Sequence, residues 1–294
     1  MRYRTFLTAV VVVLIAGTVS AVEQDYGQSN ARAQLVARKH GGEPVFLGVS
    51  FDIKPGWHIY WKNPGGAGLA TEIRWRLPED ADHGDLLWPL PVAFTQSGDI
   101  PGYGYEGSVV LATELRSATA LPGTAVVGAS VSWLACKDVC VLGSAELESS
   151  WAEVAIDPGF SVWAESLPRT FDGSDAPFIL TAKGSLTAGH IDLWLQWRTA
   201  PQSIEFFPDP PEGLEVKDVT IQSRGGLTRV DATVRSMAGS TVTPDTLDSV
   251  VVVTDENHHR RGWELAVDLT TEAQRGRTRL PARPNHPRSF ETLS

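Results

Sequence analysis

Sulfur is scarce in this chain, which has two cysteines and two methionines among 294 residues. Because Cys136 and Cys140 are the only cysteines, their only plausible disulfide partners are each other. Methionine occurs only at positions 1 and 237, so it cannot supply a set of soft metal ligands. Any sulfur chemistry of this protein therefore belongs to one local pair.

Positive charge is also in short supply. The chain has 25 lysines and arginines against 35 aspartates and glutamates, which gives a net charge of -10. Nucleic-acid binding requires a positive surface, so the composition argues against a nucleic-acid partner. The acidic balance is otherwise typical of a protein that is kept soluble by its surface charge.

No apolar run reaches the roughly 20 residues that a membrane-spanning helix needs. The longest run, residues 6–17, follows a short basic start and precedes the small residues Thr18, Ser20 and Ala21. This pattern predicts a signal peptide over residues 1–21, with an uncleaved anchor as the alternative. The mature protein is then expected in an oxidising compartment, in which a nearby cysteine pair forms a disulfide.

Long helical patterns are missing as well, apart from a possible short helix over residues 28–38. The 27 glycines and 19 prolines separate short strand-like segments, as is typical of a β-sandwich. The expected strands of a first domain, spanning residues 25–157, are 45–53, 57–62, 72–77, 108–115, 125–134 and 145–156. Its tryptophans are expected in the core, namely Trp57, Trp61, Trp75, Trp88 and Trp133.

A second set of strand-like segments follows the turn residues at 157–159 and 168–175. It predicts a second β-sandwich over residues 165–270, so the fold class is all-β with two domains. The expected strands are 178–182, 190–197, 203–207, 214–222, 227–235, 249–254 and 261–269. Residues 271–294 contain several arginines and prolines but little apolar content, which predicts a disordered tail.

The spacing of the cysteines favours chemistry over bracing. A disulfide that closes five residues contributes about 2 kcal/mol in loop-entropy estimates, against nearly 5 kcal/mol for a loop of about 100 residues. Because strands are expected on both sides, Cys136 and Cys140 are placed at a hairpin-like turn. Between them, Lys137 would favour a thiolate and Asp138 would oppose it. Redox exchange, an incidental disulfide and metal binding all remain open at this point.

Four ordered sequence blocks carry a resemblance to a known family. They are PGWHIYWKNPG (55–65), WPLP (88–91), GYGYEG (102–107) and WLACKDVCVLG (133–143). Together they resemble the periplasmic N-terminal region of the DsbD/ScsB family of thiol-disulfide interchange proteins. The resemblance covers residues 30–157 well and the second β unit more weakly.

The resemblance implies two immunoglobulin-like β-sandwich domains in tandem and a protein-disulfide reductase that needs no cofactor. Its expected partners are a thioredoxin-like electron donor and periplasmic disulfide-containing proteins. This chain has neither the family's transmembrane bundle nor a thioredoxin-like Cys-x-x-Cys, so a membrane electron carrier is expected on a separate chain. By analogy with the family, Cys140 forms the bond to the partner and Cys136 resolves it.

The family also shields its dithiol with a loop that carries aromatic residues. Tyr103 and Tyr105, which are flanked by glycines, are the candidates for this role, together with Tyr60. The alternative is that these tyrosines pack at a sandwich edge with their hydroxyls in water.

Two other classes of function stay open. A copper(I) protein with a role in copper tolerance would use the thiolates of Cys136 and Cys140, since soft ligands suit copper(I). Candidate third ligands are His58, His190, His258 and His259, although an exposed loop histidine is the plainer interpretation of each. In a noncatalytic binding module, by contrast, the disulfide would only brace a loop.

Overall fold

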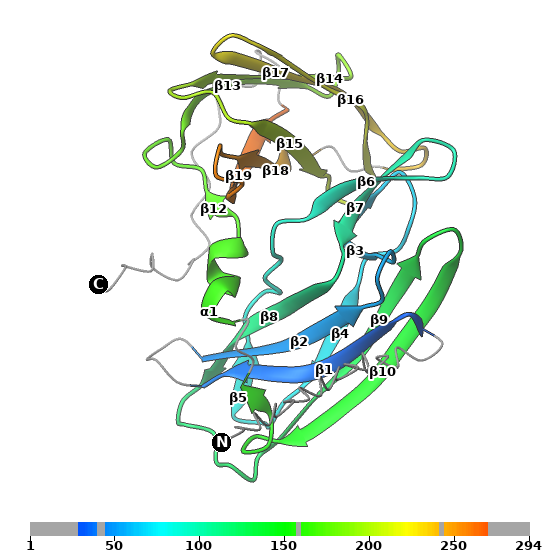
Figure 1. Ribbon diagram of the computed structural model, residues 1–294, viewed down its shortest axis with the longest axis vertical. Helices are drawn as coiled ribbons and strands as arrows, with labels where there is room; N and C mark the ends of the chain where they lie inside the picture. Colours follow the sequence, from blue (N-terminus) through cyan, green and yellow to red (C-terminus); the bar gives the residue numbers. More distant parts are fainter. Residues whose placement is uncertain (1–28, 40–44, 157–159, 241–243, 270–294) are drawn as a thin grey trace, which may run out of the picture.

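The computed structural model describes residues 29–39, 45–156, 160–240 and 244–269, and most of these residues are in β-strands (Figure 1). The signal peptide predicted over residues 1–21 and the tail predicted over 271–294 lie outside the described residues. Among the described residues, none of the helices has the length and apolar character needed to span a membrane. The predicted all-β fold class is confirmed.

The first β unit, residues 29–156, contains three sheets. The first sheet has the order β11 (Ala155–Ile156), β1 (Ala31–Arg38), β2 (Val45–Ile53), β8 (Ser108–Ser117) and β5 (Ala81–His83). The second has the order β10 (Cys140–Ser150), β9 (Val126–Cys136) and β4 (Glu72–Arg76). The third has the order β3 (Ile59–Gly65), β7 (Ile100–Tyr105) and β6 (Val92–Gln96).

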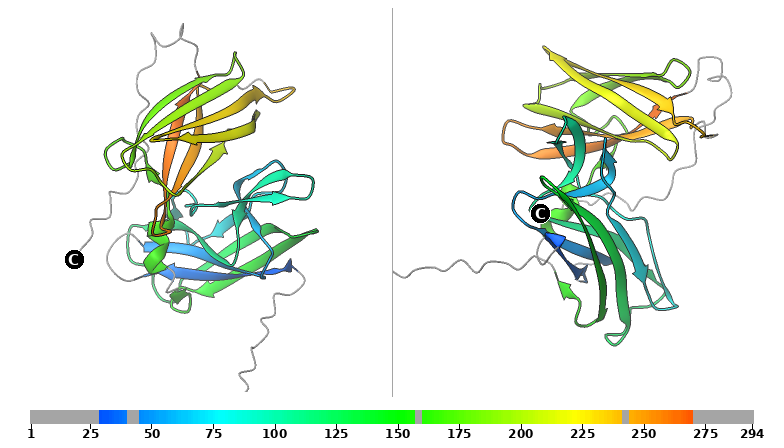
Figure 2. Two further views of the ribbon diagram at one scale, coloured as in Figure 1. Left: turned by 45° about the horizontal axis from the view of Figure 1, so that its top comes forward. Right: turned by 90° about the vertical axis from the view of Figure 1, so that its right-hand side faces the viewer.

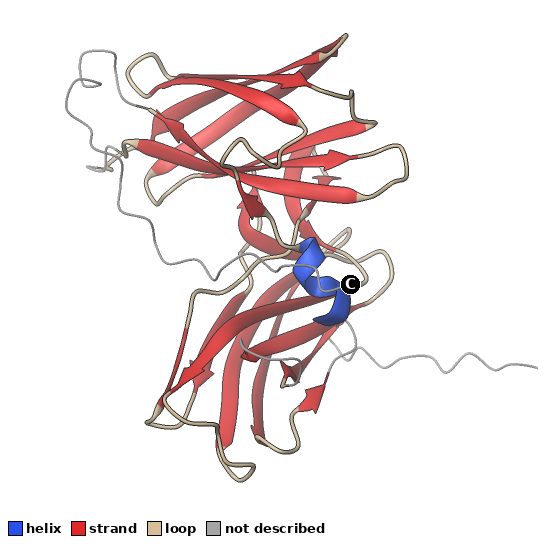
Figure 3. Cartoon of the chain, turned by 90° about the vertical axis from the view of Figure 1, so that its left-hand side faces the viewer, coloured by secondary structure: helices blue, strands red, loops and turns tan. Residues whose placement is uncertain are grey.

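The second β unit, residues 160–269, begins with the short helices α1 (Phe160–Trp163) and η2 (Ala164–Ser166), drawn in blue where the two units meet in Figure 3. One sheet has the order β12 (Arg169–Thr170), β19 (Arg260–Asp268), β18 (Thr246–Thr254) and β15 (Ser203–Asp209). The other has the order β13 (Phe178–Ser185), β14 (His190–Trp197), β17 (Leu227–Ser236) and β16 (Leu214–Arg224).

The buried side chains form one large cluster in each unit, and two strands of the second unit contribute to both. Phe206 of β15 and Val251 of β18 belong to the second cluster, whereas Phe207 and Val250 belong to the first. Since successive side chains of a strand point to opposite faces, this sheet is buried on both sides. The run of four valines at positions 250–253 is explained by that double burial, because no position there faces water.

The two units therefore share apolar packing. In both views of Figure 2 they form separate stacks of strands, with the cyan strands of the first unit lying between them. The domain boundaries predicted at 25–157 and 165–270 stay a prediction, since part of the first core comes from residues beyond 200.

The helix expected over residues 28–38 is wrong, because residues 31–38 form strand β1. Leu35 and Ala37 face the first core, while Val36 packs on the other face of the sheet in a small cluster with Trp163. Burial of both faces removes the polar alternation that marks a strand, so the apolar spacing resembles that of a helix.

Candidate active site

The two cysteines close a β-hairpin. Strand β9 ends at Cys136 and strand β10 begins at Cys140, and the two residues are directly opposite each other in the antiparallel register. A disulfide joins them, with their Cα atoms 4.1 Å apart. The hairpin position predicted from the flanking strands is confirmed.

The two sulfur-bearing residues differ in exposure. Cys136 is 1% exposed, whereas Cys140 is exposed. Along β9, Trp133 and Ala135 point into the first core, so Cys136 points to the outer face of the sheet. Its burial must therefore come from residues that cover this outer face. The Cys140 side is therefore the more exposed side of the disulfide.

His58 lies beside Cys136 on that face. The two residues exchange both backbone hydrogen bonds, from His58 N to Cys136 O at 3.0 Å and from Cys136 N to His58 O at 2.9 Å. Directly opposite residues in an antiparallel pair place their side chains on the same face. Cys140, Cys136 and His58 therefore form a row across the outer face.

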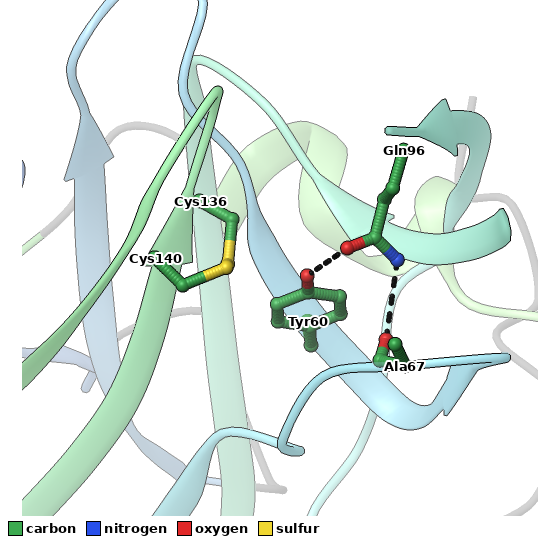
Figure 4. The surroundings of a disulfide bond; sticks show 5 residues. All are labelled: Tyr60, Ala67, Gln96, Cys136 and Cys140. Atoms are coloured by element: carbon green, nitrogen blue, oxygen red, sulfur yellow. Dashed lines mark hydrogen bonds between the residues drawn. A yellow bond between two sulfur atoms is a disulfide. The ribbon is translucent and has the colours of Figure 1, made fainter. Parts of the chain in front are cut away.

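Aromatic side chains from β3 and β6 cover the His58 end of this row. The ring of Phe94 lies 3.8 Å from the His58 ring, and the Tyr60 ring lies 5.3 Å from it, edge to face. The Tyr60 hydroxyl donates a 2.7 Å hydrogen bond to Gln96 Oε1, and Gln96 Nε2 donates to the carbonyl of Ala67 at 3.2 Å. Figure 4 shows the Tyr60 ring beside the disulfide, held by this bond.

Two glycines of β7 make room for these rings. A Cβ atom at Gly102 would lie 2.2 Å from Phe94 Cε2, and a Cβ atom at Gly104 would lie 2.0 Å from the carbonyl oxygen of Ile59. Side chains at either position would therefore displace the β6–β7 hairpin, residues 92–105. The glycines allow this hairpin to lie flat over the outer face.

Burial controls the charge of the site. Desolvation lowers the pKa of His58 from its ordinary value of 6.5 to about 4, so the ring is neutral at pH 7. His58 Nε2 is buried and has no hydrogen-bond partner among the described residues. Desolvation also raises the pKa of the Tyr60 hydroxyl. The loop between the two cysteines presents two charged residues, Lys137 and Asp138, to solvent.

Of the three tyrosines expected to shield the disulfide, the structure brings only Tyr60 to its face. Tyr103 and Tyr105 lie on the opposite, core face of β7. The Tyr103 ring packs 5.2 Å from Phe207, and the Tyr105 hydroxyl donates to the carbonyl of Pro89 at 2.8 Å. This burial raises the pKa of both hydroxyls.

Sequence reasoning missed Phe94 and Gln96 as covering residues, and it considered His58 only as a metal ligand. The alternation of residues 57–62 carried the signal for His58, because it places His58 and Tyr60 on one face. Phe94 and Gln96 share such an alternation on β6, a strand that was not predicted.

The other candidate metal ligands lie elsewhere. His190 Nε2 is 3.1 Å from Asp231 Oδ2, and His259 Nδ1 is 3.6 Å from Asp255 Oδ2, both in the second unit. His258 occupies the turn after β18, with a φ of 63°. Within the described ranges, no three side chains of histidine, cysteine, aspartate or glutamate come together as a metal site.

Comparisons with known proteins agree with this geometry. Residues 28–150 match the family model described as thiol:disulfide interchange protein DsbD, N-terminal. The crystal structure of the N-terminal periplasmic domain of ScsB from Proteus mirabilis aligns with 85% of this chain and 97% of its own length, at 22% identity and a TM-score of 0.64. The latter match shows a shared fold across both β units.

Two further comparisons add no argument. The collagen-binding domain of surface protein RspB from Erysipelothrix rhusiopathiae covers 82% of this chain at 12% identity, but its TM-score is 0.19. The comparison with curated proteins gives no match.

Proposed function

We propose that this chain carries out thiol-disulfide exchange, because residues 28–150 match the N-terminal domain of the DsbD family of thiol-disulfide interchange proteins. The chain is a periplasmic protein-disulfide reductase that passes two electrons through the Cys136–Cys140 pair. It receives them from a thioredoxin-like donor, which a membrane electron carrier on a separate chain keeps reduced. It delivers them to disulfides of other periplasmic proteins.

One observation carries this proposal, namely the unequal exposure of the two cysteines. Thiol-disulfide exchange requires that a partner reach one sulfur in line with the bond that breaks. Cys140 is exposed, while Cys136 is buried, and Figure 4 shows the Tyr60 ring beside the disulfide. Cys140 is therefore the residue that bonds to the partner, and Cys136 is the resolving residue.

The exchange balances with no cofactor. In the reduced protein, the Cys140 thiolate attacks one sulfur of the partner disulfide, which forms a mixed disulfide and releases a partner thiolate. The Cys136 thiolate then attacks Cys140 Sγ, which closes the internal disulfide and releases the second partner thiolate. Both partner thiolates take up protons, so the partner gains two electrons and two protons.

Trapping tests the proposed order. In Cys136→Ser the mixed disulfide at Cys140 has no resolving thiol in this chain, so we expect a covalent adduct with a disulfide-containing substrate to accumulate. Non-reducing gel electrophoresis and mass spectrometry would detect the adduct. The matched control is Cys140→Ser, which leaves the buried thiol and should trap at least tenfold less.

The opposite result, with Cys140→Ser trapping the partner and Cys136→Ser failing, would reverse the roles of the two residues. Failure of both variants to trap, together with an inert disulfide in the unmodified protein, would reject the exchange function itself.

A further inference from the structure

The β6–β7 hairpin touches the disulfide site with one part and the second β unit with another. Phe94 and Gln96 reach the site through the His58 ring and the Tyr60 hydroxyl. The residues at the start of β6 reach the second unit instead. Because one short hairpin joins the two regions, its position over the disulfide depends on both sets of contacts.

Glu205 of β15 and Arg260 of β19 hold the start of this hairpin. Arg260 Nη2 donates to the carbonyl of Pro91 at 2.7 Å and to Glu205 Oε2 at 2.7 Å. The second oxygen of Glu205 accepts a hydrogen bond from the backbone N–H of Ala93 at 3.4 Å. Both side chains are about 70% shielded from solvent, with exposed fractions of 28% and 30%. A charge-assisted link of this kind is stronger than a neutral hydrogen bond.

The neighbouring strand β3 rests on β15 in the same way. Lys62 Nζ lies 2.6 Å from Asp209 Oδ2, and Asn63 Nδ2 donates to the carbonyl of Pro208 at 2.6 Å. Phe207 packs between the rings of Trp61 and Tyr103, at 6.0 and 5.2 Å. Strand β15 of the second unit therefore supports both elements that cover Cys136.

We propose that the second β unit positions the β6–β7 hairpin over the disulfide through Glu205 and Arg260, and thereby limits how fast thiols reach the Cys136–Cys140 bond. Glu205 and Arg260 are positioning residues, since neither touches the sulfur atoms. This inference deepens the proposed function and rests on it, because it assigns to the second unit a role in protecting the exchanging pair.

The rate of reduction by excess dithiothreitol tests the inference. This dithiol attacks the disulfide, closes to its own cyclic disulfide and leaves Cys136 and Cys140 as thiols, which a thiol reagent counts. We expect Glu205→Ala to raise the rate about fivefold, the change that corresponds to loss of one half-buried ion pair. Phe94→Ala, which removes the ring that packs on His58 beside Cys136, should raise it by at least as much.

The matched control is Glu215→Ala. Glu215 lies on β16, has a 30% exposed side chain and pairs with Arg235 of β17 at 2.9 Å and with Lys217 of β16 at 2.7 Å, both in the second unit. Dithiothreitol should reduce the disulfide of Glu215→Ala at the same rate as that of the unmodified protein. In the double variant Phe94→Ala/Glu205→Ala, the second change should add nothing, because the hairpin no longer covers the site.

Equal rates for Glu205→Ala and Glu215→Ala would overturn the inference. So would a fivefold increase that persists in the Phe94→Ala background, since Glu205 would then act by another route. If Glu205→Ala fails to fold, Glu205→Gln keeps the side-chain shape and removes the charge, and the same two criteria apply. Dithiothreitol takes the place of a protein partner in this assay. The reduction rates therefore test the positioning role of Glu205 even if no exchange partner is found.

Discussion

Polar groups on the outer sheet face of the second β unit are paired and solvated, whereas the outer face of the first unit buries a polar atom that is unpaired among the described residues. In the second unit, Arg229 of β17 pairs with Asp192 at 2.8 Å and with Asp231 at 2.8 Å, and its guanidinium lies 5.3 Å from the Trp194 ring centre. His190 completes the network through Asp231. Each of these groups has a charged partner and access to water.

In the first unit, the outer face around the disulfide is covered by aromatic rings and contains a buried imidazole nitrogen that has no partner among the described residues. A buried polar atom that is left unpaired costs about 1–3 kcal/mol. The comparison therefore separates a desolvated face beside the disulfide from a solvated face of the second unit whose charged groups are paired.

Replacement of Gly104 by alanine should have the largest effect, because it disrupts the covered face. The new Cβ atom would meet the carbonyl oxygen of Ile59 at 2.0 Å, so strands β3 and β7 could not stay paired. We expect a loss of about 3 kcal/mol and a melting temperature lower by about 10 °C. The matched control is Gly226→Ala, whose Cβ atom would have its nearest neighbour at 3.8 Å. Equal melting temperatures for the two variants would contradict the close pairing.

Acid should destabilise the protein through His58 on the covered face, by less than the Gly104 substitution does. His58 is neutral in the folded protein with a pKa of about 4, whereas the unfolded chain binds a proton with the ordinary value of 6.5. The unfolded state therefore holds more protons between these values, so the contribution of His58 to stability is present above pH 6.5 and is lost as the pH falls towards 4. With allowance for solvent screening, the loss is about 2 kcal/mol.

Urea unfolding at pH 7 and pH 4.5 would measure this loss. The variant His58→Phe keeps a ring against Phe94 and removes the titrating group, so its stability should fall less than that of the unmodified protein. Parallel losses in the two proteins would show that His58 does not titrate as its burial requires.

Strands with a clear turn at each end were predicted well from the sequence. Residues 45–53 stop at a Pro-Gly turn, and residues 190–197 alternate between apolar and polar side chains except at Trp194, so both were placed with their correct bounds. Strand β7 was missed because glycines such as Gly102 and Gly104 are typical of turns. In the structure they are strand residues that give space to Phe94 and to the backbone of Ile59. Such a use of glycine depends on a neighbour that local sequence does not reveal.

Only those parts of the site that depend on residues close together in the sequence could be predicted. The cysteine pair and its hairpin follow from spacing and flanking strands, and Tyr60 follows from the family resemblance. The hydrogen bond from the Ala93 backbone N–H to Glu205 joins residues 112 positions apart, and no local sequence pattern predicts it. Tyr103 and Tyr105 show the same limit, since alternation places them on one face but does not say which face meets the disulfide.

The smallest effect is expected on the paired face. In Arg229→Gln the shape of the side chain is largely kept, while Asp192 and Asp231 lose their cation and turn to water, which already reaches both carboxylates. Partly exposed ion pairs contribute about 1 kcal/mol or less, so the melting temperature should fall by about 2 °C, and the rate of disulfide reduction by dithiothreitol should not change. A change in that rate would show that the outer face of the second unit communicates with the disulfide. The difference between the two faces would then be one of degree, and the route through Glu205 would be only part of the coupling.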